Sequence, residues 1–443
     1  MSGILILGAG RSSSSLITYL QRKAQQKQWP LTVGDYSLEA ARERLAAVGY
    51  GTAIRFDIHD QELSVATIAE ADIVVSLMPA HLHAVVALHC LRHGKHLLTA
   101  SYITEEMKLL DDEARKKGLL FLNECGLDPG IDHMSAMQVI DRIRDEGGKL
   151  ISFESFTGGL IAPGTAPENP WRYKFTWNPR NVVMAGQSTA KYLLDGRYQY
   201  VPYQQLFRRT TPVTVDGVAY EGYANRDSLK YRGVYGLNDI QTMLRGTLRY
   251  KGFCSAWNVL VQLGCCDDTY DMENVATMTH ADFIESFVVR GTRSVREALC
   301  ETFLLEPMGD EVTKLAWSGL FSDERVGLTS GTPAKILEHI LLKKWTLLSD
   351  DRDFVVMWHR FIYEQNGKKN VLHAHLTATG SNAVDTAMAR TVGLPLGIAA
   401  GLLMDGKIVT RGVAIPVSRD IYEPVLTELK TYGIELVEEL VTG

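Results

Sequence analysis

Short runs of apolar residues alternate with helical segments along the first third of the chain. Six runs have the length and continuous hydrophobicity of buried parallel strands: GILIL at 3–7, LTV at 31–33, AIRF at 53–56, DIVVSLM at 72–78, HLLTA at 96–100 and LLFL at 119–122. The segments between them, such as SLEAARERLAAV at 37–48, carry helix-forming residues with charge on one face. This alternation predicts a Rossmann-like α/β domain, a doubly wound parallel sheet with helices on both faces.

A glycine-containing turn, LILGAGRSSSSLI, follows the first predicted strand. Gly8 permits a tight turn, and Gly10 lets the backbone approach a pyrophosphate at the start of a helix, which Arg11, Ser12 and Ser13 begin. The third glycine of the usual fingerprint is missing, so the motif alone is weak. Its place between a strand and a helix nevertheless favours a dinucleotide. The alternative is an ordinary strand–helix turn with serines that cap the helix.

The second predicted strand ends at Asp35, where a carboxylate can accept hydrogen bonds from the adenosine ribose. A carboxylate there repels a 2′-phosphate, so we expect NAD as the cofactor and NADP as the second choice. Arg42 and Arg44, one turn further on, could serve a phosphate, although solvated helix-surface charges are the more typical reading. Asp57, after the third strand, fits either the border of an adenine pocket or a helix cap.

Other cofactor contacts are expected at the carboxyl ends of the strands, because ligands of open α/β sheets bind at that edge. The complete set of expected cofactor-binding residues is Gly8, Gly10, Arg11, Ser12, Ser13, Asp35, Tyr36, Asp57, Leu77, Pro79, Ala100, Ser101, Leu127, Asp128, Pro129, Gly130 and Ile131.

The rest of the chain mixes strand-like and helical patterns. An Asn-Gly turn between alternating apolar residues at 353–378 is the pattern of a β-hairpin. Helix-type patterning dominates the stretch before it, as in PAKILEHILLKKW. We therefore expect three parts: a nucleotide-binding domain at 1–126, an α+β substrate and dimerisation domain at 127–262 and 348–394, and a helical insertion at 263–347.

Composition narrows the class of partner. A formal net charge of −6 argues against a nucleic-acid partner, which usually needs a basic face. No uninterrupted apolar run approaches the roughly 20 residues of a membrane span, and the N-terminus lacks a signal-peptide pattern. The six cysteines lack CxxC spacing and read as reduced thiols. We therefore expect a cytoplasmic protein with no membrane or nucleic-acid partner.

Five of the twelve histidines fall between residues 81 and 96. His89 and His93 have the i, i+4 spacing of a zinc pair, but no further ligand lies at a matching spacing. We therefore expect these histidines at the surface or at helix ends, and no metal site.

Several long motifs define a family resemblance: GLDPGIDHM at 126–134, GGLIAPGTAPENPWRYKFTW at 158–177, YANRDSLKY at 223–231, LRGTLRYKGF at 244–253 and AMARTVGLPLGIAAGLLMDG at 387–406. Together they closely resemble saccharopine dehydrogenase of the L-glutamate-forming type, over nearly the whole chain. The resemblance implies oxidation of saccharopine by a nicotinamide cofactor to L-glutamate and α-aminoadipate semialdehyde, or the reverse condensation, in the lysine α-aminoadipate pathway. It also implies that 395–443 completes the nucleotide-binding domain, and a homodimer fits the substrate sheet.

Two details depart from the fungal members of that family. Those enzymes use NADP and carry an arginine one position after the acidic residue, where this chain has Tyr36. The Asp35 pattern resembles the NAD-using animal-type domain instead. Fungal members also have a cysteine before the Gly-Gly pair, where this chain has Thr157, so a role for that thiol cannot carry over.

Saccharopine carries three carboxylates and two amines, so its pocket needs arginines and at least one carboxylate. By resemblance, the expected substrate contacts in the second domain are Arg226, Thr247, Leu248 and Arg249. Trp177 is expected on the substrate or nicotinamide side, with core packing as the alternative.

The acid–base groups are expected where the nucleotide-binding domain ends. Ser101 and Tyr102 follow the fifth strand and Asp128 follows the sixth, so all three lie at the ligand edge and are expected to contact substrate. Candidates for proton transfer are Tyr102, Asp128 and His133, with Lys174 as a fourth. Imine chemistry requires no metal, so Asp128, Asp132 and His133 are not expected to be metal ligands.

Two other functions stay open. A related C–N dehydrogenase or reductase, of the lysine 6-dehydrogenase or carboxynorspermidine type, would keep the nucleotide domain, but the motifs NRDS and LRGTLR favour saccharopine. A non-catalytic, NAD-bound metabolite sensor is the other, against which the intact Tyr102, Asp128, Arg226 and Arg249 argue. Neither the direction of the reaction nor association with a lysine-ketoglutarate reductase follows from the residues.

Overall fold

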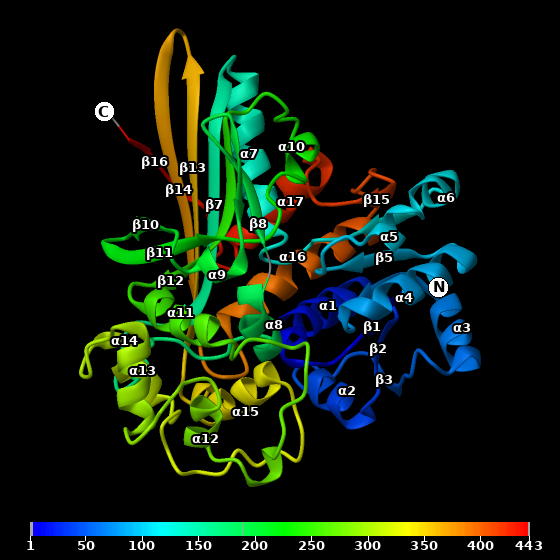
Figure 1. Cartoon of the computed structure of the whole chain (residues 1–443). Coiled ribbons are helices and arrows are strands. Elements are labelled where there is room, and N and C mark those ends of the chain that lie inside the picture. The colour runs from blue at the N-terminus through cyan, green and yellow to red at the C-terminus, as the bar shows by residue number, and fades with distance from the viewer. Residues whose placement is uncertain (1–2, 188, 442–443) are drawn as a thin grey trace. The chain divides into compact units, whose positions relative to one another are not determined.

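The computed structural model describes residues 3–187 and 189–441, and Figure 1 shows the whole chain. The side chain of Arg11 lies outside this description. The chain divides into two compact units. The first comprises Met1–Lys149 with Leu376–Val437, and the second comprises Leu150–His375 with Glu438–Gly443.

The first unit is built on a seven-stranded parallel sheet. Its strands, in spatial order, are β15 (Gly412–Ala414), β6 (Leu120–Leu122), β5 (His96–Thr99), β4 (Ala71–Ser76), β1 (Gly3–Leu7), β2 (Leu31–Asp35) and β3 (Thr52–Arg55). The strand order reverses between β1 and β4, which is the point where ligands of such sheets bind. The expected Rossmann-like sheet and its six strands are confirmed, and β15 adds a seventh strand from late in the chain (orange in Figure 1).

The sheet of the first unit carries many short helices and a few long ones: η1 (Arg11–Ser13), α1 (Ser14–Lys27), α2 (Leu38–Leu45), α3 (Gln61–Glu70), η2 (Ala80–Leu82), α4 (His83–His93), α5 (Glu105–Lys108), α6 (Asp111–Lys116), α7 (Ile131–Asp145), α16 (Ala387–Met404) and α17 (Arg419–Lys430). Helix α16 packs tightly on α1, because a Cβ at Gly393 would lie only 2.9 Å from the backbone nitrogen of Leu16. Among the described residues, α16 alone is long and apolar enough to cross a membrane. However, 83% of this helix is buried inside the protein, as is typical of a core helix.

The observed units differ from the expected domain limits. The first unit runs past residue 126 because α7 packs on α17, where the Tyr422 hydroxyl donates to Asp141 Oδ2 at 2.8 Å. Its C-terminal part begins at Leu376 rather than at residue 395. The expected helical insertion at 263–347 is not a separate unit, since it belongs to the second one.

The second unit is built on a nine-stranded sheet. Its main path is β10 (Thr210–Val215), β11 (Val218–Ala224), β12 (Thr242–Tyr250), β7 (Lys149–Ile161), β13 (Asp353–Gln365), β14 (Lys368–Thr379) and β16 (Val437–Val441), and β8 (Ala190–Leu194) joins β12 to β9 (Arg197–Val201). Strands β13 and β14 form the expected hairpin. Its turn residues Asn366 and Gly367 have φ angles of 53° and 73°, the left-handed geometry that an Asn-Gly turn favours.

The helices of the second unit pack around an aromatic core: α8 (Pro179–Met184), η3 (Ala185–Gln187), α9 (Tyr203–Leu206), α10 (Tyr231–Val234), α11 (Phe253–Leu263), η4 (Val275–Thr277), α12 (His280–Glu285), α13 (Val295–Phe303), α14 (Asp310–Trp317) and α15 (Pro333–Trp345). The rings of Trp171 and Trp345 lie 5.1 Å apart, edge to face. The Trp171 indole also donates to the carbonyl of Lys314 in α14 at 2.7 Å. These contacts explain why the helical segment shares one core with the sheet.

Candidate active site and family

The glycine turn after β1 has the geometry that a nucleotide site needs. Gly8 has a φ of 108°, and a Cβ there would lie 3.1 Å from the carbonyl of Leu77, so only glycine fits. Apart from its two chain neighbours, a Cβ at Gly10 would meet no atom of the described residues within 4 Å, so packing against them does not require this glycine. The Ser13 hydroxyl is buried and donates to the Gly10 carbonyl at 2.7 Å, which gives it a structural role in the turn rather than a ligand contact.

Asp35 ties the end of β2 to the same turn. Its Oδ2 accepts a hydrogen bond from the Ala9 amide at 2.7 Å, and its Oδ1 accepts one from the Ser37 amide at 2.8 Å. Arg44 also reaches this turn, because its Nε donates to the Ala9 carbonyl at 3.3 Å. The expectation that Arg44 is a solvated surface charge is therefore wrong, whereas Arg42 is exposed and pairs with Glu39 on its own helix.

Two further cofactor candidates flank this region. Tyr36 is 69% exposed, and the guanidinium of Arg55 lies 5.3 Å from the centre of its ring. Asp57 accepts from the His59 amide at 3.0 Å, while the following helix α3 is capped by Asp60. The alternative of Asp57 as a helix cap is thus wrong.

A buried histidine joins the carboxyl ends of β4 and β5. His83 Nδ1 lies 2.9 Å from Ser76 Oγ, and its Nε2 lies 2.8 Å from Ser101 Oγ and 3.2 Å from Thr99 Oγ1. Burial, and then the nearby His81, lower the pKa of His83 to about 4, so the imidazole is neutral at physiological pH. The expectation of a surface or cap histidine is wrong here, because His83 is only 4% exposed. Its partners lie on separate strands, which no local pattern reveals.

The remaining expected contacts at this edge divide into exposed and buried positions. Ser12, Leu77 and Ala100 are partly exposed and Pro79 is exposed, whereas the side chains of Leu127, Pro129 and Ile131 are buried. The buried ones can reach a ligand only through their backbone.

The loop GLDPGIDHM closes on itself at its two glycines. The Gly126 amide donates to the Pro129 carbonyl at 2.9 Å, and the peptide bond between Asp128 and Pro129 is cis. Gly130 has a φ of 150°, and a Cβ there would lie 2.0 Å from the Gly126 carbonyl oxygen. Asp132 Oδ1 accepts from the Gly130 amide at 2.6 Å, so this carboxylate fastens the loop to the start of α7.

Two of the three acid–base candidates lie together. The Tyr102 hydroxyl donates toward Asp128 Oδ1 at 3.5 Å, and both side chains are partly exposed. This is a long contact for an O–H···O hydrogen bond. It brings a phenol and a carboxyl group to the ligand edge of the sheet, on loops that follow β5 and β6.

The third candidate, His133, has a different role. It is fully buried, with its Nε2 2.9 Å from Glu124 Oε2, and Glu124 Oε1 accepts from the Ile103 amide at 3.0 Å. A side chain with no exposed surface is not in direct contact with a ligand that enters from solvent. We therefore revise His133 from an acid–base candidate to a group that holds the Tyr102 segment against α7.

Lys174, the fourth candidate, is likewise structural. Its Nζ lies 2.6 Å from Asp351 Oδ2, and the two side chains are 4% and 9% exposed. Breaking such a buried pair would leave an uncompensated charge, which favours a structural role.

Three of the expected substrate residues of the second unit, Thr247, Leu248 and Arg249, lie on β12. Arg249 is 3% exposed, and its guanidinium lies 4.9 Å from the ring centre of Tyr173 and 5.2 Å from that of Phe253. Its Nη1 donates to the Leu248 carbonyl at 2.9 Å. Its Nε is buried and has no hydrogen-bond partner among the described residues. Leaving a buried guanidinium unmatched by a carboxylate is costly, so Arg249 is a candidate anion-binding group.

The other expected substrate residues of the second unit vary in exposure. Thr247 pairs with Tyr223 across β11 and β12, and Leu248 is fully buried beneath Gly158, where a Cβ would lie 2.7 Å from the Leu248 carbonyl. Trp177 is 36% exposed, so it is not the core residue of the alternative reading. Arg226 is exposed and follows the end of β11.

A parallel sheet with this strand order, a glycine turn after β1 and an acidic residue at the end of β2 is typical of a dinucleotide-binding domain. Two family models match the chain: "Saccharopine dehydrogenase NADP binding domain" at residues 4–122 and "Saccharopine dehydrogenase C-terminal domain" at 126–434. The chain belongs to the saccharopine dehydrogenase family.

Individual relatives support this family membership. The chain is 32% identical to saccharopine dehydrogenase [NADP(+), L-glutamate-forming] of Pyricularia oryzae, over 99% of both chains. It is 35% identical to the mitochondrial alpha-aminoadipic semialdehyde synthase of Rattus norvegicus over 97% of its own length, but it spans only 47% of that protein. The solved structure of apo histidine-tagged saccharopine dehydrogenase (L-Glu forming) from Saccharomyces cerevisiae matches with a TM-score of 0.90 and 31% identity, over 100% of both chains. A nicotinamide nucleotide as the cofactor class is confirmed, whereas the family model and the fungal names specify NADP.

Proposed function

We propose that the protein oxidises saccharopine with a nicotinamide dinucleotide, releasing L-glutamate and α-aminoadipate semialdehyde, or catalyses the reverse condensation. The observation that carries this proposal is the buried Arg249, whose guanidinium faces aromatic rings and has no carboxylate partner among the described residues. A substrate with three carboxylates supplies that partner. The proposal does not extend to the whole activity of the synthases, because the chain spans about half of their length.

The chain's own residues can manage the protons of this reaction. The secondary amine of saccharopine must lose a proton before the neighbouring carbon releases a hydride, and the resulting imine must take up water. When bound, the nicotinamide ring accepts that hydride. We assign proton acceptance to the Asp128 carboxylate, with the Tyr102 hydroxyl, 3.5 Å from Oδ1, as the group that orients it and relays a proton.

Binding of the substrate carboxylates is assigned to the arginines of the second unit. Arg249 is held by its aromatic neighbours, so little side-chain entropy is lost when it grips an anion. Arg226, which is exposed, is assigned to a second carboxylate. Arg245 is not, because it is buried with its guanidinium 4.3 Å from the ring centre of Tyr231.

For the cofactor we propose NAD in preference to NADP, although the fungal relatives are named for NADP(+). The support is electrostatic: the Asp35 carboxylate sits beside the glycine turn, where it would accept ribose hydroxyls and repel a 2′-phosphate. Arg44 and Arg55 are the groups that would offset this repulsion if NADP is used instead.

The experiment is a spectrophotometric assay of the purified protein with saccharopine and each oxidised cofactor in turn. The expected result is reduced cofactor with saccharopine and none with L-lysine alone, and a higher kcat/KM with NAD than with NADP. Turnover of L-lysine or of carboxynorspermidine in place of saccharopine would establish a sister enzyme. Binding of saccharopine and NAD without any reduction would establish the metabolite sensor.

We also propose a cytoplasmic homodimer that binds saccharopine, glutamate and α-aminoadipate semialdehyde as its small-molecule partners. Light scattering on the eluted protein tests the dimer, and a mass of one chain at assay concentrations would contradict it. Cell fractionation tests the location.

A further inference from the structure

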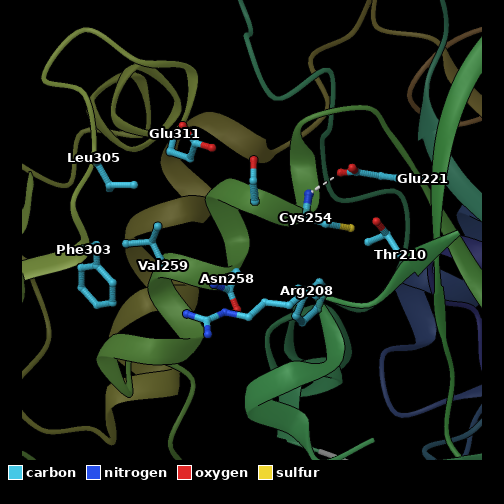
Figure 2. A pocket seen from close by; sticks show the side chains of 11 residues that line it. Arg208, Thr210, Glu221, Cys254, Asn258, Val259, Phe303, Leu305 and Glu311 are labelled. Carbon is cyan, nitrogen blue, oxygen red and sulfur yellow. Dashed lines mark hydrogen bonds between the residues drawn. The ribbon is translucent and has the colours of Figure 1, made fainter. Parts of the chain in front are cut away.

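A cavity of about 380 Å³ opens in the second unit, on the face of the sheet that α11 covers (Figure 2). It is formed by the segment after α9, strands β10 and β11, the start of α11 and the adjoining ends of α13 and α14. This volume is at the lower end of the range for small-molecule sites. No residue that we assign to saccharopine or to the dinucleotide lines it.

The cavity carries charges of both signs. Arg208 supplies a guanidinium, which extends toward Asn258 and Phe303 in Figure 2, and Glu221 and Glu311 supply two carboxylates. Neither Arg208 nor Glu311 forms an ion pair with any part of the chain that the structure describes. Glu221 accepts a hydrogen bond from the Cys254 amide at the start of α11, which fixes its position and leaves it further acceptor capacity.

The rest of the lining is apolar or neutral. Val259, Phe303 and Leu305 form a hydrophobic wall between the charged groups. The Cys254 thiol adds no charge, because burial, and then the neighbouring Glu221 carboxylate, raise its pKa well above the ordinary value. A matching ligand therefore has one anionic group, two cationic groups and an aliphatic stretch between them.

We propose that this cavity binds an α-amino acid with a second, terminal amino group, its carboxylate on Arg208, its two ammonium groups on Glu221 and Glu311, and its methylene chain on the apolar wall. The numbers of positive and negative groups in the cavity decide this class of ligand. Saccharopine and glutamate carry additional carboxylates, which two glutamates would repel. A plain diamine would leave Arg208 unmatched, and a neutral amino acid would leave one carboxylate unmatched.

The test is calorimetric titration of the intact protein with L-lysine as the probe. L-norleucine, which lacks the terminal amine, and 1,5-diaminopentane, which lacks the carboxylate, are the comparison ligands. We expect each to bind about tenfold more weakly than L-lysine or worse, the loss of one charge-assisted contact. Equal binding of the three ligands, or no binding of L-lysine, would overturn the proposal.

Matched variants locate the binding. Arg208→Gln and Glu311→Gln should each weaken L-lysine binding about tenfold or more. The controls Arg209→Gln and Glu306→Gln change neighbouring exposed residues that do not line the cavity and should leave binding unchanged. Binding that survives both cavity variants but disappears in Arg249→Met would place the probe at the assigned substrate residue, and the proposal would be wrong. This titration needs no turnover, so it stands or falls separately from the proposed enzymatic activity.

Discussion

The imidazole Nε2 of His83 lies 2.8 Å from the Oγ of Ser101, and its Nδ1 lies 2.9 Å from the Oγ of Ser76. One neutral ring thus connects the ends of two neighbouring parallel strands, β4 and β5. Ser101 stands next to Tyr102, so the ring fixes the backbone and hydroxyl that lead into the acid–base pair. His83 is therefore a positioning residue rather than a catalytic one.

Isosteric variants separate the contacts of the two ring nitrogens of His83. Glutamine places its amide near the Nε2 position and asparagine near the Nδ1 position, so His83→Gln should keep the Ser101 contact and His83→Asn should lose it. We expect His83→Asn to lower kcat/KM for saccharopine about tenfold, the equivalent of one hydrogen bond, and His83→Gln to lower it less. Thermal unfolding of both variants is the control. Equal losses of activity and stability in the two would contradict a positioning role.

The same histidine makes stability depend on pH. Its folded-state pKa is lowered from 6.5 to about 4, so the unfolded chain binds the proton more readily. Its contribution to stability is therefore complete above pH 6.5 and is lost as the pH falls toward 4. The full loss is about 3 kcal/mol. The unfolding midpoint in urea, measured at neutral and mildly acidic pH, should fall less in His83→Gln than in the natural protein, and equal falls would argue against this assignment.

Burial of the Glu124–His133 pair leads to a prediction about His133. Its ring is fully buried 2.9 Å from a carboxylate oxygen, so His133→Ala should destabilise the fold by about 3–5 kcal/mol. The folded fraction should keep its pH–rate profile, because the ring does not exchange protons with substrate. A variant that stays folded but loses one limb of the profile would restore His133 as an acid–base group.

Local motifs account for what could be predicted, and distant contacts account for what could not. Gly8 and Asp35 follow directly from a strand, a turn and the next strand, which short sequence windows contain. His83 looked like a surface histidine because its partners Ser76 and Ser101 are serines at strand ends, with no periodic signal. Strand β15 pairs with β6 from nearly 300 residues away, so only the folded chain reveals it. Burial of His133 likewise depends on Glu124 across a loop.

Asp35 offers a direct test of cofactor choice. Asp35→Ser removes the carboxylate that the Ala9 amide holds, along with its proposed bonds to the ribose. We expect kcat/KM for NAD to fall by about 10- to 100-fold, the loss of one or two charge-assisted hydrogen bonds, and that for NADP to fall much less. The control Glu39→Gln removes a nearby exposed carboxylate that pairs with Arg42 and should change neither value. A parallel fall for both cofactors would show that Asp35 only supports the turn.

We expect Arg249 to lower the stability of the fold and to be required for substrate binding. Its guanidinium is buried among Tyr173, Tyr223 and Phe253, and its Nε has no hydrogen-bond partner among the described residues. Methionine has a similar length and no charge, so Arg249→Met should match or raise the unfolding temperature, because an apolar chain fits that setting better. The same variant should lose at least about 30-fold in kcat/KM for saccharopine, the consequence of leaving a substrate carboxylate unpaired at a cost of 2 kcal/mol or more. Arg249→Lys keeps the charge but not the bidentate fork of the guanidinium, so its kcat/KM for saccharopine should lie between the values of Arg249→Met and of the unsubstituted protein. A variant with lowered stability and unchanged KM would instead mean that Arg249 serves the core alone.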